Sequence, residues 1–333
     1  VYKRQVSASE AYKHFLEIDP HYKPGICSKG YRWNQDYRSH RATRYEYCCP
    51  KLAQHFANLE AKAKAQYGDI EKNLNASLQG VSLPIDDLTS FVNTIPPKTG
   101  VKCEAHRKNV IQASGDAIQC GHQGIITTSE KTGRVHCAVN RLSTHLRTYL
   151  TLFGESVVEI DLASSQPYFL ATLVDSPALS DAVSSGEFYS RINERLSLSV
   201  DFNDPDAYGS FKQKVLAIIY AKPVNGFDYT KDKKFRNRHI LKALEAAFPG
   251  VTYFIERYRT NHGPTALPIQ MQRLESQVFI NGVLAKLQQL DIPAVPIHDS
   301  ILCRRSDAPQ VKELIYDQLI INTSITPTLK LSA

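Results

Sequence analysis

Two aspartates stand at the polar ends of apolar segments that have the length of strands. Asp299 lies in "AVPIHDSILC" (294–303), where two apolar runs flank a single His-Asp-Ser step, and Asp161 ends the run "VVEID" (157–161). Burying a carboxylate is costly unless its charge is compensated, so each acid either faces water in a turn or holds a cation. Two aspartates on adjacent strands could bridge two Mg²⁺ ions roughly 3.5–4 Å apart and support phosphoryl transfer.

A third element between the two acids carries residues suited to nucleotide binding. Lys212, Leu216 and Tyr220 follow one another at intervals of four residues, so they share one stripe of a predicted helix. A lysine offers a point charge to phosphate, and a tyrosine two turns further on could stack on a base. The simpler interpretation also stands, in which Lys212 is a solvated helix residue and Tyr220 belongs to the core.

The elements that must position these residues indicate an α+β fold, because strands and helices are mixed without regular alternation. Asp204-Pro205 provides an N-cap and a first-turn proline for the helix that carries Lys212. A strand at 157–161 precedes an apolar helical run, and the acid-bearing hairpin lies at 294–303. The helix that carries Lys212 spans 205–221, and the other predicted helices span 8–18, 50–66, 69–78 and 268–290.

The bulk composition agrees with a protein that handles nucleic acid. The 333 residues suffice for roughly two domains, and 40 Lys and Arg with a net charge of +7 favour a polyanionic partner. No run approaches the ~20 apolar residues of a membrane span, and seven cysteines without a CxxC pair indicate a reducing compartment. We therefore expect a cytoplasmic protein, or an intracellular protein of a phage or mobile element. The first five residues, "VYKRQ", resemble the translated read-through of a sequencing adapter and are no guide to the fold.

In this order, the three elements resemble the polymerase motifs of family A DNA polymerases, the bacterial DNA polymerase I type. "DLASSQPYFLA" (161–171) resembles motif A, "KQKVLAIIYAKPVNG" (212–226) motif B and "IHDSILC" (297–303) motif C. Further segments similar to those of the family occur in the expected order at "TGRVH" (132–136), "FPGVTYFIERYR" (248–259) and "PIQMQRLES" (268–276).

The resemblance spans roughly residues 127–333 and implies a right-hand palm with an antiparallel sheet, helical fingers at about 175–262, and a separate, mainly helical region at 1–126. It implies a role for each matching residue. Two Mg²⁺ ions, or Mn²⁺, would be held by Asp161, Asp299 and the backbone carbonyl of Leu162. Lys212, Leu216 and Tyr220 would contact the incoming triphosphate and the nascent base pair. Arg134, His298 and Gln270 would contact the primer–template duplex.

Four positions depart from the family pattern and bear on the choice of nucleotide. Ser300 replaces the usual glutamate after the motif C aspartate, as in single-subunit phage-type RNA polymerases, and "EKTGRVH" (130–136) is also similar to those enzymes. Tyr208 replaces an arginine, and Ala221 a glycine. Gln166 occupies the place of the family's steric-gate glutamate, where a long side chain would crowd a ribose 2′-hydroxyl.

These observations predict a template-directed polymerase that extends a primer from nucleoside triphosphates, most simply a DNA polymerase without an exonuclease. An RNA polymerase or primase is the alternative within the class. A two-metal nuclease and a catalytically silent nucleic-acid-binding protein are the alternatives from other classes. Basic and aromatic residues at 31–47 and the basic run at 231–239 could contact nucleic acid. A loosely spaced set of possible zinc ligands is formed by Cys103, His106, Cys120 and His122.

Overall fold

The computed structural model describes residues 16–18, 31–33, 50–98, 101, 103–121, 124–220 and 237–332. These residues combine helices with an antiparallel sheet, so the predicted α+β class is confirmed. Most of the basic loop at 31–47 and of the basic run at 231–239 lies outside the described residues. No helix within the described ranges is both long enough and apolar enough to cross a membrane.

The central sheet has the strand order β3-β6-β7-β9-β8. β10 pairs with the last four residues of β7, whereas β6 pairs with its first two. All of the sheet's pairings are antiparallel. Its strands are β3 (Val81–Ser82), β6 (Thr151–Leu152), β7 (Glu155–Leu162), β8 (Ala294–Ile297), β9 (Ser300–Arg304) and β10 (Leu329–Ser332). The predicted strand at 157–161 and the predicted hairpin are therefore present as β7 and as β8 with β9.

Strand β7 lies at the centre of this sheet because its sequence suits burial. Val157, Val158, Ile160 and Leu162 are almost fully buried, and β-branched side chains such as valine and isoleucine pack well on a pleated surface. Only Glu159 and Asp161 interrupt this apolar run, and they project from the same face because strand side chains alternate. The strand therefore has an apolar body and two acids near its end.

Two short ribbons lie outside the sheet. β1 (Leu16–Ile18) pairs with β2 (Tyr31–Trp33), and β4 (Thr127–Thr128) pairs with β5 (Val135–His136). The helix predicted at 8–18 is wrong at its end, because Leu16–Ile18 is a strand. The stretch is too short for its pattern of apolar residues to distinguish a helix from a strand.

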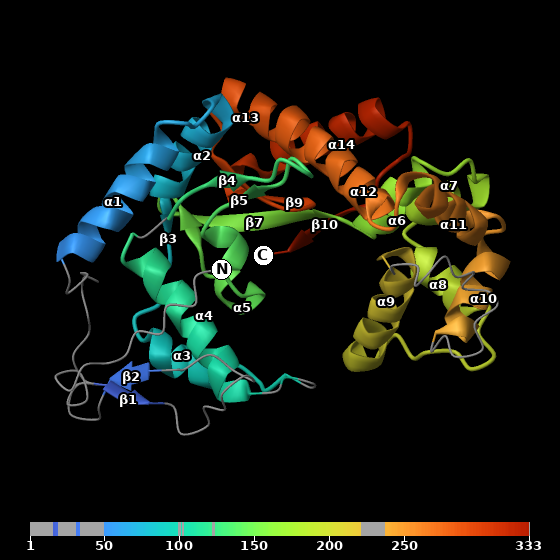
Figure 1. Ribbon diagram of the computed structural model, residues 1–333, viewed down its shortest axis with the longest axis horizontal. Coiled ribbons are helices and arrows are strands. Elements are labelled where there is room, and N and C mark those ends of the chain that lie inside the picture. Colours follow the sequence, from blue (N-terminus) through green and yellow to red (C-terminus); the bar gives the residue numbers. More distant parts are fainter. Residues whose placement is uncertain are drawn as a thin grey trace.

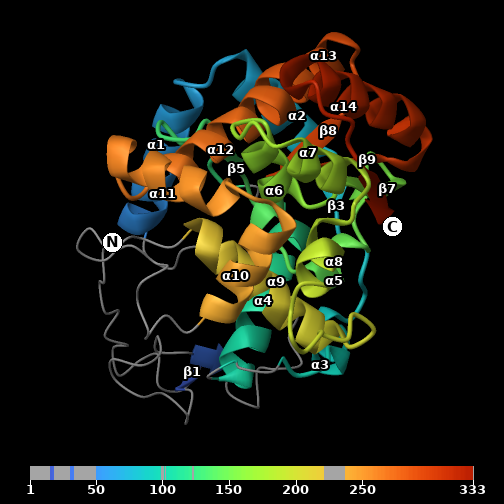
Figure 2. The same ribbon diagram turned by 90° about the vertical axis from the view of Figure 1, so that its right-hand side faces the viewer.

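Helices gather on two sides of the sheet and over it (Figures 1 and 2). One group precedes β4 and consists of α1 (Pro50–Lys64), α2 (Asp69–Gln79), α3 (Leu88–Thr94) and α4 (Glu104–Gln119). The group at the other side consists of α7 (Pro177–Ser184), α8 (Phe188–Asn193), α9 (Pro205–Tyr220), α10 (Arg238–Ala247) and α11 (Val251–His262). The remaining helical segments are η3 (Val139–Arg141), α5 (Thr144–Arg147), α6 (Ser165–Ala171), α12 (Ala266–Ser276), η4 (Gln277–Leu284), α13 (Ala285–Gln289), η5 (Arg305–Asp307) and α14 (Ala308–Thr323).

The described part of the predicted insert at 175–262 is thus mainly helical, as are the described residues before 127. Division of the chain into domains at 126/127 stays a prediction. The helices predicted at 50–66, 69–78 and 205–221 correspond to α1, α2 and α9. Asp204 caps α9 as expected, because its Oδ1 accepts hydrogen bonds from the backbone N–H groups of Asp206 (2.9 Å) and Ala207 (3.2 Å).

The helix predicted at 268–290 runs from α12 through η4 to α13, and its middle section, η4, is a π-helix. Such wider turns are rare and often occur at functional sites. Gly282 lies in this section against the buried Gln318 side chain, where a Cβ atom would come within 2.6 Å of the Gln318 Oε1 atom. A side chain at position 282 would therefore have to displace the end of the Gln318 side chain.

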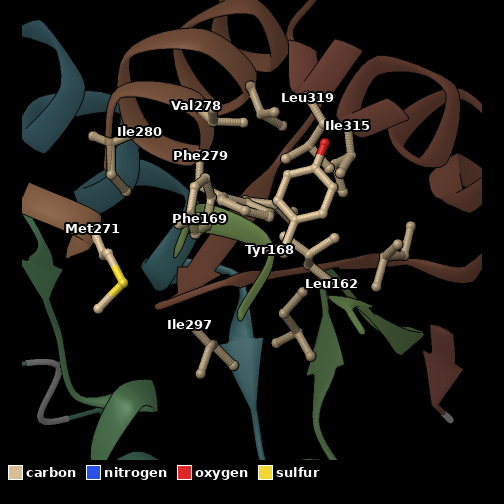
Figure 3. Close-up of a cluster of buried hydrophobic side chains, with 14 of the residues drawn as sticks. Leu162, Tyr168, Phe169, Met271, Val278, Phe279, Ile280, Ile297, Ile315 and Leu319 are labelled. Carbon is tan, nitrogen blue, oxygen red and sulfur yellow. The ribbon is translucent and has the colours of Figure 1, made fainter. Parts of the chain in front are cut away.

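An apolar cluster joins β7 to the helices above it (Figure 3). Tyr168 and Phe169 of α6 pack with Phe279 of η4 and with Ile315 and Leu319 of α14, all fully buried. The Tyr168 hydroxyl donates to the carbonyl oxygen of residue 325 at 2.6 Å, and burial raises its pKa to about 12. This cluster fixes α6 relative to the end of β7, where the first aspartate of the predicted pair lies.

Candidate active site

The strand pairing brings Asp161 and Asp299 together. β7 and β9 are antiparallel neighbours with Asp161 opposite Ser300, and Asp299 directly precedes Ser300 in the β8–β9 turn. The backbone N–H of Leu162 donates to the Asp299 carbonyl oxygen at 3.2 Å, which closes the ladder at this end. Two acids far apart in sequence therefore occupy adjacent backbone positions at one end of the sheet.

The charge of Asp161 is only partly balanced by the protein around it. Burial raises the pKa of Asp161 to about 7, with further contributions from the negative charges of Asp299 and Glu159. Lys330 and Lys212 act in the opposite direction but do not overcome these effects. A carboxyl group that is partly buried beside other acids disfavours its charged form, and a bound cation would remove that penalty.

The donor set fits Mg²⁺ better than a metal that needs a closed protein cage. Within the described ranges, no group of three or more His, Cys, Asp or Glu side chains is placed to hold a metal ion. Mg²⁺ prefers hard oxygen ligands, is often held by one or two carboxylates, and completes its shell with water and substrate phosphates. Asp161, Asp299 and the Leu162 carbonyl oxygen are ligands of this kind.

The possible zinc ligands do not assemble in the described residues. Cys103 and Cys120 stand at the two ends of α4, whose 16 residues separate them by about 25 Å at 1.5 Å per residue. They cannot bind the same ion, since zinc–sulfur bonds are about 2.3 Å long. His122 lies outside the described residues.

Glu159 is a third acid in the same region that the motifs do not include. Its Oε1 accepts a hydrogen bond from the Ser300 hydroxyl at 2.8 Å, and its Oε2 is 3.1 Å from the Arg147 Nε atom. Ser300 is thus a hydrogen-bond donor to an acid on the neighbouring strand. The alternation of strand side chains could have indicated Glu159, because it precedes Asp161 by two residues.

The tip of the acid-bearing hairpin has an unusual backbone. His298 has a φ of 56°, in the left-handed region that few non-glycine residues adopt. Its ring packs edge-on against His136, with 5.9 Å between centroids, and its Nδ1 atom is buried without a hydrogen-bond partner among the described residues. Burial first, and the charge of Arg134 second, lower the pKa of His298.

The predicted stripe on α9 faces partly toward the acids. Lys212, Leu216 and Tyr220 are half-buried, and the charge of Lys212 is close enough to affect Asp161. The Lys212 Nζ atom lies 4.6 Å from the centroid of the Tyr208 ring, in a cation–π contact. Tyr208 thus contacts the lysine one turn further along the helix.

A hydrogen-bonded network joins four elements beside the two aspartates. Arg134 contacts Glu275 of α12 through two parallel bonds of 2.7 Å, and the Gln166 side-chain amide donates to Glu275 Oε2 at 2.8 Å. The Tyr220 hydroxyl in turn donates to Gln166 Oε1. Glu275 is fully buried. Its role has no signal in the sequence, because nothing local identifies it as the partner of an arginine 141 residues away.

Close packing brings Arg134 to this network. Gly133 has a φ of 73°, and a Cβ atom there would lie 3.1 Å from the Cβ atom of Ser276, next to Glu275. A larger residue would strain the turn and push it away from α12. Gln270, the other residue expected at the duplex, is half-buried on the same helix.

Lys330 is a further residue at the site without a signal in the sequence. It lies on β10 directly across from Asp161, and its charge lowers the pKa of that acid. Only the pairing of the last described strand with β7 places it there.

Comparisons with known proteins leave the family open. No protein-family model matches the chain, and no curated protein matches it in sequence. One solved structure with a matching arrangement is the POL domain of Pol1 from M. smegmatis, in complex with DNA primer-template and dNTP. It has 12% sequence identity and a TM-score of 0.46, and the match covers 84% of this chain and 65% of that one. The chain thus spans less than two thirds of that structure's length, and the match is too distant to carry an argument.

Proposed function

We propose that this chain is a template-directed nucleotidyltransferase, and that it synthesises DNA in preference to RNA. The observation that carries the proposal is that Asp161, at the end of β7, lies beside Asp299 in the β8–β9 turn, where burial and the charges of Asp299 and Glu159 raise the pKa of Asp161 to about 7. Such perturbed acids are concentrated at functional sites. The order of the three sequence motifs agrees with the proposal.

Each residue of the site has a role in this reaction. Bound Mg²⁺ would supply neutralisation of developing phosphate charge and activation of the primer 3′-hydroxyl. Asp161 and Asp299, with the Leu162 carbonyl oxygen, would hold it. Lys212 would contact the triphosphate of the incoming nucleotide, since an ammonium group on a helix is a point charge for phosphate. Positioning and charge neutralisation supply most of the catalysis in phosphoryl transfer.

The contacts of Gln166 favour deoxynucleotides. Gln166 lies in the first turn of α6, four residues after Leu162, and both ends of its side-chain amide are bonded, to Tyr220 and to Glu275. A side chain fixed in this way cannot readily move to admit a ribose 2′-hydroxyl. We therefore propose deoxynucleoside triphosphates as the substrates.

Primer extension with purified protein tests the proposal. A labelled primer–template is incubated with Mg²⁺ and either dNTPs or NTPs, and product length is followed over time. We expect extension with dNTPs that is lost in Asp161→Asn. Exclusive use of NTPs would overturn the assignment to DNA synthesis. Degradation of the labelled DNA without nucleotides would instead favour a nuclease, and binding without either reaction would favour a silent relative.

A further inference from the structure

We propose that Glu275 is a positioning residue that holds the Gln166 side chain in one orientation, and that its negative charge is the reason an amide stands at position 166. The inference rests on the proposed function for its consequence, which is selection of the nucleotide sugar. The link between the two side chains is a property of the folded protein alone.

Both polar atoms of the Gln166 side-chain amide form hydrogen bonds within the protein. Its Nε2 atom donates to Glu275 Oε2 at 2.8 Å, and its Oε1 atom accepts from the Tyr220 hydroxyl. Glu275 is itself fixed, since Arg134 binds both of its oxygens at 2.7 Å in a bidentate pair. Because Glu275 is fully buried, no water competes for these bonds. Glu275 on α12, held by Arg134 between β4 and β5, thus determines the orientation of Gln166.

The chemistry of the amide matches its two neighbours. Glutamine both donates and accepts, whereas an ionised glutamate only accepts. Tyr220 donates to position 166 and the Glu275 carboxylate accepts from it, so the residue between them must do both. A glutamate at position 166 would set two carboxylates against each other in a buried site, which is strongly unfavourable.

The orientation of Gln166 matters because the residue follows the acid-bearing strand in the first turn of α6 and bonds to Tyr220 of α9. With Glu275 in place, the amide oxygen is directed to Tyr220 and the side chain stays where it would meet the 2′ position of a nucleotide sugar. Without this bond, the side chain can rotate away. The expected consequence is a weaker preference for deoxynucleotides, with a smaller change in the rate of chemistry itself.

A charge exchange between the two positions tests the inference. Four proteins are compared, namely wild type, Gln166→Glu, Glu275→Gln and the double variant that carries both changes. In Glu275→Gln, one amide oxygen must serve Arg134 and Gln166 together, while its NH₂ group faces a donor. In the double variant the roles are reversed, because the new amide at position 275 would donate to the new carboxylate at position 166, and Arg134 keeps one acceptor. Glu104→Gln, which removes an Arg–Glu pair with Arg107 on α4, is the matched control.

The readout is the ratio of kcat/KM for a dNTP to that for the matching NTP, measured in one preparation so that a partly unfolded fraction cancels. We expect each single variant to lower this ratio about tenfold, the factor that corresponds to roughly 1.4 kcal/mol for one charge-assisted hydrogen bond. The double variant should return to within about threefold of wild type, and Glu104→Gln should not change the ratio. Losses that multiply in the double variant, or a wild-type ratio in Gln166→Glu, would overturn the inference.

The melting temperatures of the same proteins separate this inference from the proposed function. If wild type extends a primer with neither dNTPs nor NTPs, the proposed function fails, and the link between the side chains is decided by stability alone. The link predicts that the double variant melts closer to wild type than Gln166→Glu does. A double variant that melts lower by the sum of both single losses contradicts it.

Discussion

Two carboxyl groups near the same sheet end, one fully buried and one partly buried, lie in opposite surroundings. Glu275 is fully buried, yet Arg134 and Gln166 donate three hydrogen bonds to its two oxygens. Asp161 is less buried, but its nearest charged neighbours include two more acids, Asp299 and Glu159. Burial raises the pKa of both groups, and only at Glu275 do hydrogen bonds and a cationic partner work strongly against that rise.

The difference separates structural charge from functional charge. A buried carboxylate with its bonds complete fixes the elements around it, and breaking the pair leaves an uncompensated charge. A carboxyl group set beside other acids lowers stability, so the arrangement is useful only if a ligand completes it. On this account Glu275 organises the site, and Asp161 with Asp299 carries out its chemistry.

The largest expected effect is the loss of activity in Asp299→Asn. The change keeps the side-chain shape but removes a metal-binding charge, so nucleotide addition should slow on the order of 10³-fold. The free energy of unfolding should not decrease, because repulsion with Asp161 is relieved. Single-turnover primer extension and urea unfolding measure the two quantities. If the variant is inactive because it is unfolded, Asp299 would be needed for stability, which contradicts its assignment as a functional charge.

Arg134→Leu should mainly reduce the stability of the folded protein. It leaves Glu275 buried without its cation, which costs roughly 3–5 kcal/mol of unfolding free energy. Arg191→Leu is the control, since it removes an arginine of similar connectivity from the exposed pairs with Asp181 and Glu187 and should cost about 1 kcal/mol or less. Equal losses in the two variants, measured by urea unfolding, would show that the Glu275 pair is not special.

The raised pKa of Asp161 predicts that the free energy of unfolding depends on pH when no divalent ion is present. Its pKa is about 7 in the folded protein against 3.8 in the reference state, so the folded protein holds this proton more tightly than the unfolded chain. The favourable contribution is complete below about pH 4 and is lost as pH rises toward 7. Urea unfolding should show this decline in wild type but not in Asp161→Asn.

Added Mg²⁺ supplies the control for that titration, because an ion that binds only the folded state stabilises it. Mg²⁺ should raise the stability of wild type near pH 7 and have little effect on Asp161→Asn. Identical pH curves for the two proteins would contradict the assignment of the decline to Asp161.

The smallest predicted effect concerns Tyr208, which lies outside both carboxyl sites. Its ring holds Lys212 by a contact of about 0.5–1 kcal/mol, so Tyr208→Leu should raise the KM for nucleotide about threefold with little change in kcat. Tyr208→Phe keeps the ring and should behave like wild type. Steady-state kinetics of both variants decide the point, and a raised KM in the phenylalanine variant would rule out the cation–π explanation.

Features set by short stretches of sequence could be predicted. The apolar run before Asp161, the hairpin at Asp299 and the capped helix at Asp204 each follow from local patterns of alternation, turn residues and capping. Their order along the chain also indicated which of them would meet. The structure confirms the elements, and it places Asp161 on β7 next to the turn that carries Asp299.

Features set by tertiary packing could not be predicted. The bond between Arg134 and Glu275 joins residues 141 apart, and Lys330 reaches Asp161 only because β10 returns to pair with β7. Gly282 of η4 meets the Gln318 side chain of α14 only because the two helices pack together in the folded chain. In each case the residue type alone is compatible with an ordinary surface position, and only the folded arrangement decides its role.

The central claim is that Asp161 and Asp299 act as one unit, and single-turnover primer extension by Asp161→Asn, Asp299→Asn and the double variant tests it most directly. Groups that hold a ligand jointly have strongly non-additive effects. We predict that the double variant is no slower than the slower single variant, within about threefold. Losses that multiply, so that the double variant falls by the product of both, would show that the two aspartates work separately and would contradict the account.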